Sequence, residues 1–314
     1  MLGKTAGGLF WMSRYLERSK NIARLIDAGF RIALTQSHSA NTEWASVIAT
    51  TGVKDTYETV HSDNYDGMNV IDFLLRDYSN PSSVISVMRN ARNNARLSRT
   101  ALTRDVWEAV NESWMMISHR LKTPIAHKDL PDVLGLIRRQ SALVQGTLHG
   151  TMLRNDIYDF VRLGTFVERA DNTARILDVK YYILLPSVQD VGSPLDNQQW
   201  ETILRSVSAE QSYRWHHRDE ITAKGIAHFL IWDDSLPQSL AFSVKELVAI
   251  LGYLDSTYEK VSPSSNIASK FLQDLNSQNV DTIFESGLHE FIAMFLNRNN
   301  ELAATIERDF RFSV

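Results

Sequence analysis

Apolar residues recur at helical spacing along most of the chain. Residues three or four positions apart lie on one side of an α-helix. No segment shows the strict alternation of apolar and polar residues that predicts a half-buried β-strand. The pattern therefore predicts an all-α protein. The apolar positions of two such segments are Leu16, Ala23, Ile26 and Phe30, and Val167, Ala174, Leu177 and Tyr181.

Several helix ends can be predicted from polar residues and prolines. Asn80-Pro81 predicts an N-cap followed by proline at the first helical position, which would open a long helix from 81 to about 121. Two prolines within 122–131 predict a connection, and another helix is expected to start near Asp132. A further helix is predicted from about 158 to 185.

Two blocks of sequence recur in the same order. Residues 17–27 return as 168–178, at an offset of 151 and with six of eleven residues identical. Residues 73–83 return as 229–239, at an offset of 156 and again with six of eleven identical. The repetition predicts one helical domain, 1–314, built as a bundle from two duplicated halves of about 1–130 and 131–314 that share a core around a pseudo-two-fold axis.

Composition excludes several classes of function. The chain has no cysteine, so disulfides and thiolate metal sites are excluded. Its formal net charge of −4 argues against a general polycation for nucleic acid. No secretory signal and no apolar run long enough for a membrane span is present, so we expect a cytoplasmic protein without a membrane partner. No metal site is expected, because the repeat counterpart of the candidate ligand Glu58 is Arg214.

A polar stripe lies within the first repeated block. Glu17, Asn21 and Arg24 are spaced i, i+4 and i+7, which places them on one side of a helix, and the second block repeats the pattern. Apolar residues bracket the stripe on its own face, which predicts partial burial. Buried polar groups must be paired, either across the pseudo-two-fold axis or with a ligand; the alternative is a solvated face laced with salt bridges. The stripe and its neighbours are Glu17, Arg18, Asn21, Arg24, Asp27, Glu168, Arg169, Asn172, Arg175 and Asp178.

A row of arginines occurs in the first half only. The row comprises Arg89, Arg92, Arg96 and Arg99. Spacings of three, four and three residues would place them along one edge of the predicted helix 81–121. They could bind a phosphate- or carboxylate-bearing ligand; the alternatives are a solvated basic face or pairing with Glu17, Glu168, Asp27 and Asp178. Aromatic residues do not interleave with the row, so nucleic acid is not expected.

The repeated motifs resemble a known family. Residues 11–18 (WMSRYLER) and 166–175 (FVERADNTAR) are similar to the twin signatures of the alpha-E family, bacterial all-helical proteins named for their ER motif. Residues 80–83 and 91–96 also resemble that family's pattern, and the chain departs from it at Arg162 and Thr165. The resemblance implies ATP-grasp amide-bond ligases and transglutaminase-like proteins as partners, and it assigns no activity to the helical protein itself.

Two functions follow as hypotheses. The first is an accessory component of a peptide-ligase system that binds a ligand or the partner enzyme. In it, Glu17 and Glu168 would orient Arg24 and Arg175, with Asn21 and Asn172 as hydrogen-bond bridges. The second is an enzyme acting on amide or amine substrates, with Glu17 or Glu168 as general base. Arginines within one helical turn lower the pKa of a carboxylate, which favours the first function.

Overall fold

The computed structural model describes residues 1–35, 40–182, 194–216 and 221–312. These residues form fifteen α-helices and two short 3-10 helices, and none of them forms a strand, so the all-α prediction is confirmed. The first helices are α1 (Gly3–Thr35), α2 (Ala40–Thr51), α3 (Lys54–His61), α4 (Gly67–Leu75), α5 (Val84–Leu97), η1 (Arg99–Ala101), α6 (Arg104–Arg120), η2 (His127–Asp129) and α7 (Leu130–Thr151). The others are α8 (Asp156–Tyr182), α9 (Pro194–Ser206), α10 (Glu210–His216), α11 (Ala223–Trp232), α12 (Leu240–Tyr258), α13 (Pro263–Asn276), α14 (Val280–Ser286) and α15 (Leu288–Asp309).

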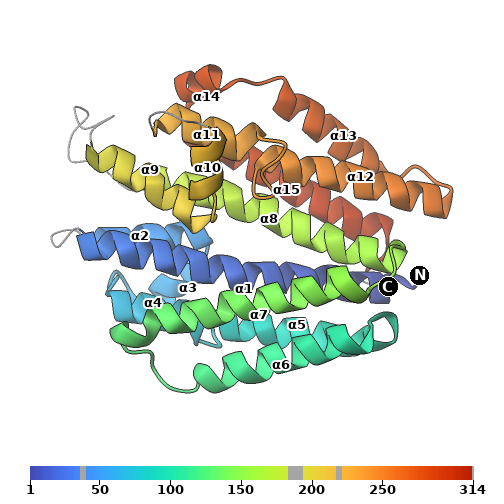
Figure 1. Ribbon diagram of the computed structural model, residues 1–314, viewed down its shortest axis with the longest axis horizontal. Helices are drawn as coiled ribbons and strands as arrows, with labels where there is room; N and C mark the ends of the chain where they lie inside the picture. Colours follow the sequence, from blue (N-terminus) through green and yellow to red (C-terminus); the bar gives the residue numbers. More distant parts are fainter. Residues whose placement is uncertain (36–39, 183–193, 217–220, 313–314) are drawn as a thin grey trace.

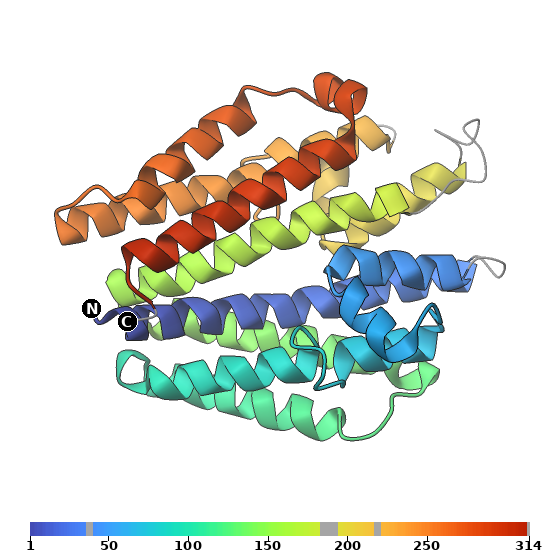
Figure 2. The ribbon, with the colours of Figure 1, turned by 180° about the vertical axis from the view of Figure 1, so that it is seen from behind.

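Helices α1 and α8 lie side by side through the middle of the molecule (Figure 1). Helices α5 and α7 pack against α1, whereas α12 and α15 pack against α8. Helix α2 contacts both central helices, and so does α9. The same arrangement is visible from behind in Figure 2, where the red α15 lies beside the yellow-green α8. The two repeated blocks of sequence therefore form the central helix pair.

The prediction of Asn80 as a helix N-cap was wrong. Helix α5 begins at Val84, and its N-cap is Ser83, whose Oγ accepts a hydrogen bond from the backbone N–H of Ser86 at 3.3 Å. Asn80 instead closes the preceding turn, because its amide donates to the carbonyl oxygen of Phe73 at 3.2 Å. Ser239, at the matching position 156 residues later, caps α12 in the same way as Ser83 caps α5.

The predicted helix 81–121 is also divided. Helix α5 ends at Leu97 and α6 begins at Arg104, with the 3-10 turn η1 between them. Thr103 caps α6 through a hydrogen bond from the N–H of Val106 at 3.3 Å. Because of this break, α6 packs back against α5 and α7. The helix expected near Asp132 starts at Leu130, and the one expected over 158–185 is α8, although residue 185 lies outside the described residues.

Matching aromatic pairs occur in the two halves. The rings of Tyr57 and Phe73 meet edge to face at 5.1 Å, and those of Tyr213 and Phe229, each 156 residues later, meet edge to face at 5.4 Å. Both tyrosines and both phenylalanines are buried. These pairs agree with an internal duplication, which stays a prediction together with its boundary near residue 130.

The close crossing of α1 and α8 predicts an intolerant glycine. A Cβ at Gly164 would collide with the backbone carbonyl of Phe10. We expect Gly164→Ala to lower the free energy of unfolding by about 1–3 kcal/mol, because backbone cannot yield as a flexible side chain can. Gly146→Ala on α7, where a Cβ would meet nothing within 4 Å, is the matched control and is expected to be neutral or to gain up to about 1 kcal/mol. Urea unfolding of both variants checks this, and equal effects would contradict it.

Candidate ligand cleft at the paired Glu-Arg helices

The two Glu-Arg sequences pair reciprocally across α1 and α8. Glu17 accepts a hydrogen bond from Nε of Arg169 at 3.1 Å. Glu168 accepts from Nε of Arg18 at 2.5 Å and from its Nη2 at 2.9 Å. Neighbouring residues on a helix point about 100° apart, so each Glu can face the interior while the Arg beside it reaches across to the other helix.

Each glutamate has further partners, and these differ between the halves. Glu168 also accepts from Nε of Arg14 at 2.9 Å. Glu17 accepts from the amide of Gln145 on α7 and lies 3.5 Å from Nζ of Lys20. The carboxylates are almost fully buried, with 3% of the Glu17 side chain and 1% of the Glu168 side chain exposed.

Both glutamates are held in the ionised form. Burial alone would raise the pKa of Glu17, but the charges of Lys20, Arg169 and Arg24 outweigh it and lower this pKa to about 2. Burial likewise opposes the ionised form of Glu168, and Arg18 and Arg14 lower its pKa to about 2. Each carboxylate is therefore ionised near neutral pH but is only a weak base, because general-base catalysis works best with a pKa near the operating pH.

The roles predicted within each stripe were wrong. Neither Glu17 nor Glu168 hydrogen-bonds the arginine seven residues later. Arg24 donates to Oγ of Ser208 at 3.3 Å, and Arg175 donates to both oxygens of Asp171 at 2.7 and 3.4 Å. Asp171 is one helical turn from Arg175 and is therefore closer to it than Glu168, which is two turns away. Arg24 has Lys20 at the matching position, and it bonds Ser208 in the turn after α9 instead.

The two aspartates that end the repeated blocks each have a partner on another helix. Asp27 accepts from Nη1 of Arg138 on α7 at 3.2 Å and from Nε of Arg31 at 3.3 Å. Asp178 lies 2.7 Å from Nδ1 of His289 on α15. Both aspartates therefore tie a central helix to its outer neighbour.

A cleft of about 230 Å³ lies between α1, α8 and the turn after α2. The turn places Gly52 at the rim with φ +71°, where a Cβ would also come within 3.0 Å of Nη1 of Arg175. The carbonyl of Thr50 accepts from that Nη1 at 3.4 Å. Glu168 also lines the cleft. The other charged and amide side chains on the wall are Arg14, Arg18, Asn21, Asp171, Asn172 and Arg175.

The wall of the cleft carries hydrogen-bond donors that no other described residue uses. Asn21 and Asn172 are each 6% exposed, and neither side-chain amide forms a hydrogen bond with another described residue. They were predicted to be bridges within the stripe, and they are not. Arg14 hydrogen-bonds through Nε alone among the described residues. Three guanidinium groups face two carboxylates here, so the cleft has a formal excess of one positive charge.

The arginine row lies elsewhere. Arg89, Arg92 and Arg96 are on α5, but Arg99 is in η1, so the prediction of four arginines on one helix was wrong. Arg92 donates to Oδ1 of Asn111 at 2.7 Å. Arg89 stacks over Tyr78 and Arg99 over Trp107, at 4.9 and 5.4 Å from the ring centres. Arg89, Arg96 and Arg99 are exposed, and none of the four pairs with Glu17, Glu168, Asp27 or Asp178, whose partners are given above.

Four residues that were not predicted from the sequence contact Glu17, Glu168 or Arg175. Arg14 and Lys20 flank Glu17 at three residues on either side, which is a helical spacing that could have revealed them. Asp171 stands one turn from Arg175 and could have been found in the same way. Gln145 belongs to no motif, and only the packing of α7 on α1 brings it to Glu17.

Two buried helices joined by reciprocal Glu-Arg pairs define a class of all-helical protein that is organised around this dipeptide. The chain belongs to the Alpha-E family, described as "a predicted alpha-helical domain with a conserved ER motif", whose sequence model matches residues 1–310. Uncharacterized proteins of Mycobacterium bovis and Mycobacterium tuberculosis are 22% identical to it over 288 residues, covering 86% of this chain. The chain spans only 31% of the length of these relatives.

No solved structure matches the chain. No helix among the described residues is long and apolar enough to cross a membrane.

Proposed function

We propose that this protein is a binding component of an ATP-grasp-type peptide-ligase system, and that the cleft between α1 and α8 holds its ligand. The observation that carries the proposal is that Asn21 and Asn172 line the cleft with side-chain amides that hydrogen-bond no other described residue. Amides that line a cleft and have no protein partner can donate to and accept from a ligand that enters it.

The chemistry of the wall favours a short peptide with a free carboxylate. An asparagine amide both donates and accepts, and so it complements a peptide group. Arg14 keeps its two terminal nitrogens for a carboxylate, while its Nε is bound to Glu168. The single excess positive charge suits one carboxylate. An amide-bond ligase joins a carboxylate to an amine, so such a ligand fits either its substrate or its product.

Two further considerations support an accessory role. The matched relatives are about three times as long as this chain, which is what a domain that works beside other domains would show. The family resemblance suggests ATP-grasp ligases and transglutaminase-like proteins as the partners, in the cytoplasm. The exposed arginine row on α5 and η1 is a candidate surface for docking such a partner or for contacting an anion.

The alternative function is an enzyme that uses a glutamate of the ER motif as base. It is kept because Glu168 lines an open cleft. It is disfavoured because a general base works best with a pKa near the operating pH, whereas the pKa values of Glu17 and Glu168 are both about 2.

The experiment compares N-acetylated dipeptides that carry a free C-terminal carboxylate with their C-terminal amides, by calorimetric titration. We expect the carboxylates to bind and the double variant Asn21→Leu/Asn172→Leu to bind them at least about tenfold more weakly, since each lost hydrogen bond contributes about 1 kcal/mol. The free energy of unfolding should stay within about 1 kcal/mol, because the amides have no partner to lose. Asn266→Leu, at an exposed position on α13, is the control. Equal binding of amides and carboxylates, or full binding by the double variant, would refute the proposal.

A further inference from the structure

A second set of residues repeats the cleft wall on the opposite face of the central helix pair. Lys20, Arg24 and Arg169 occupy the positions of Asp171, Arg175 and Arg18, at the repeat offset of 151. The turn after α9 corresponds to the turn after α2, which lines the cleft. Ser208 stands where Gly52 stands, 156 residues apart, and both have positive φ, +59° and +71°. We call Lys20, Arg24 and Arg169 the cationic site.

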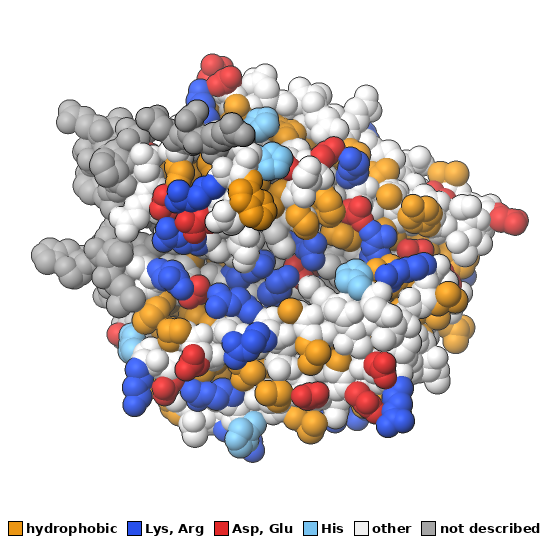
Figure 3. Space-filling model, in the orientation of Figure 1, with side chains coloured by type: hydrophobic (Ala, Val, Ile, Leu, Met, Phe, Trp, Pro, Cys, Tyr) orange, Lys and Arg blue, Asp and Glu red, His pale blue; other side chains and the backbone are white. Residues whose placement is uncertain are grey.

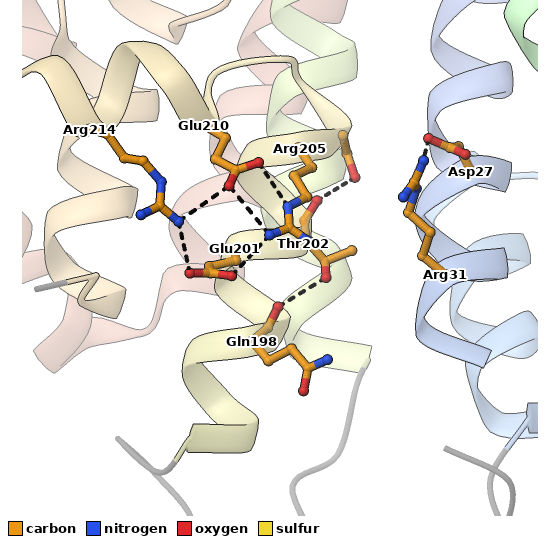
Figure 4. A network of polar contacts seen from close by, with 9 residues as sticks. Asp27, Arg31, Gln198, Glu201, Thr202, Arg205, Glu210 and Arg214 are labelled. Carbon is orange, nitrogen blue, oxygen red and sulfur yellow. Dashed lines mark hydrogen bonds and ion pairs between the residues drawn. The ribbon is translucent and has the colours of Figure 1, made fainter. Parts of the chain in front are cut away.

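The turn that carries Ser208 is braced by its own ion pairs. Figure 4 shows Arg205 at the end of α9 reaching across the turn to Glu210 on α10, with Nε 2.8 Å from the carboxylate. Arg214 and Glu201 complete this network at 3.3 and 3.4 Å. These four charges neutralise one another, so they add no net charge to the cationic site. The bracing holds Oγ of Ser208 at 3.3 Å from Nη2 of Arg24.

One residue differs in charge between the two faces: Lys20 stands where the other face has Asp171. In the cleft, Nε of Arg175 donates to Asp171 at 2.7 Å. The corresponding residue on the other face is Lys20, which cannot accept a hydrogen bond. Nε of Arg24 is consequently buried without a hydrogen-bond partner among the residues that the structure describes. A buried N–H that lacks an acceptor is rare in folded proteins and indicates a missing group.

The cationic site also has fewer carboxylates than cations, so its positive charges are not neutralised. Within the described part of the chain, Lys20, Arg24 and Arg169 share Glu17 as their one carboxylate, which leaves a formal excess of two positive charges. Arg138, whose charge also acts on Arg24, is itself bound to Asp27 at 3.2 Å. Burial lowers the pKa of Lys20 and of Arg24, and neighbouring cations lower both further, although Glu17 opposes this. The site would thus be stabilised by an anion.

We propose that the cationic site binds a phosphoryl group as its dianion. Two negative charges match the excess of two positive charges, and tetrahedral oxygens can accept from several donors at once. Nε of Arg24 and the ammonium of Lys20 supply donors, and Arg169 still has Nη2 beyond the bonds it makes to Glu17 and Pro237. Side chains of Lys20 and Arg169 are 13% and 12% exposed, which leaves an approach from solvent. Figure 3 shows lysine and arginine side chains gathered near the middle of the face seen in Figure 1, on which α9 and α10 lie.

Calorimetric titration of the full chain at pH 8 and constant ionic strength tests the proposal with three probes: inorganic phosphate, phosphoserine and adenosine 5′-monophosphate. Tighter binding of inorganic phosphate would identify the free ion as the ligand. Tighter binding of phosphoserine or the nucleotide would identify a phosphorylated molecule. No binding of any probe at millimolar concentration would overturn the proposal.

Variants at position 20 locate the binding. Lys20→Asp recreates the Asp171–Arg175 arrangement and supplies Nε of Arg24 with an acceptor, so we expect at least a tenfold loss of affinity. Lys270→Asp, at an exposed position on α13, changes the net charge equally and should bind as the wild type does. Lys20→Gln removes only the cation and serves if Lys20→Asp does not fold. Wild-type affinity in the folded position-20 variant would overturn the proposal.

The cationic site is independent of the peptide cleft. We expect Asn21→Leu/Asn172→Leu to keep phosphate binding and Lys20→Asp to keep binding of the dipeptide carboxylates. Loss of one binding activity therefore leaves the other proposal standing.

Discussion

The Glu168→Gln variant is expected to lose about 3–5 kcal/mol of its free energy of unfolding. The substitution keeps the size of the side chain but removes the charge that neutralises Arg14 and Arg18, which donate to it at 2.9 and 2.5 Å. Breaking a buried ion pair by removing one partner is costly because the other charge stays buried and uncompensated. Urea unfolding followed by circular dichroism at neutral pH measures the loss.

Glu108→Gln is the matched control for this prediction. Glu108 pairs with Arg104 on α6, with side chains 56% and 85% exposed. Exposed pairs of this kind contribute about 0–1 kcal/mol, so the control should differ little from the wild type. If Glu168→Gln costs no more than Glu108→Gln, the reciprocal pairs do not hold the central helices together. Glu17→Gln tests the second pair, and a loss of similar size is expected because the charge of Glu17 stabilises Lys20, Arg24 and Arg169.

The all-α class could be predicted from sequence because periodicity is a property of the whole helix. The ends of individual helices could not be predicted, because they depend on which of several polar residues forms the cap. Asn80 and Ser83 are both good N-caps by residue type. Asn80 hydrogen-bonds to Phe73 instead, and Ser83 takes the cap. The break between α5 and α6 was missed for a similar reason, since Ser98 and Thr103 carry no strong signal until Thr103 is seen to cap α6.

The stripe residues could be predicted, but their partners could not. The pairing of Glu17 with Arg169 joins residues far apart in sequence, and it depends on how closely α1 and α8 cross. Helical spacing alone suggested partners within the same stripe, and the structure replaced them with Ser208 and Asp171. The sequence did indicate an asymmetry between the halves, in the arginine row. The asymmetry that bears on ligands lies at positions 20 and 171, where lysine in one repeat replaces aspartate in the other.

The exchange at positions 20 and 171 gives the two faces different chemistry on one scaffold. Both faces share an ER pair, an arginine two turns further on and a turn with positive φ. One face holds Arg175 with its own carboxylate and leaves two amides free, which suits a peptide carboxylate. The other leaves Arg24 unsatisfied and cationic, which suits a phosphoryl dianion. Under the proposed duplication and the two proposed sites, one scaffold would present two ligand chemistries while the structural pairs stay the same.

Acid is expected to remove much of the stability that the ER pairs provide. The pKa of Glu17 and of Glu168 is lowered from 4.5 to about 2 in the folded chain, so the unfolded state binds more protons between these values. Stability from these groups is therefore fully present above about pH 4.5 and is lost as the pH falls through about 2. One pKa unit corresponds to 1.36 kcal/mol, which gives about 3 kcal/mol for each carboxylate.

Other carboxyl groups act in the opposite direction, so the comparison must be between variants. Burial raises the pKa of Asp159, Asp178 and Glu307, and these groups therefore favour the folded state as the pH falls. The difference in free energy of unfolding between wild type and Glu168→Gln cancels their contribution. This difference should be constant above about pH 5 and shrink by about 3 kcal/mol toward pH 2. Urea midpoints at half-unit steps of pH measure it, and a difference that does not change with pH would show that Glu168 is not held ionised by its arginines.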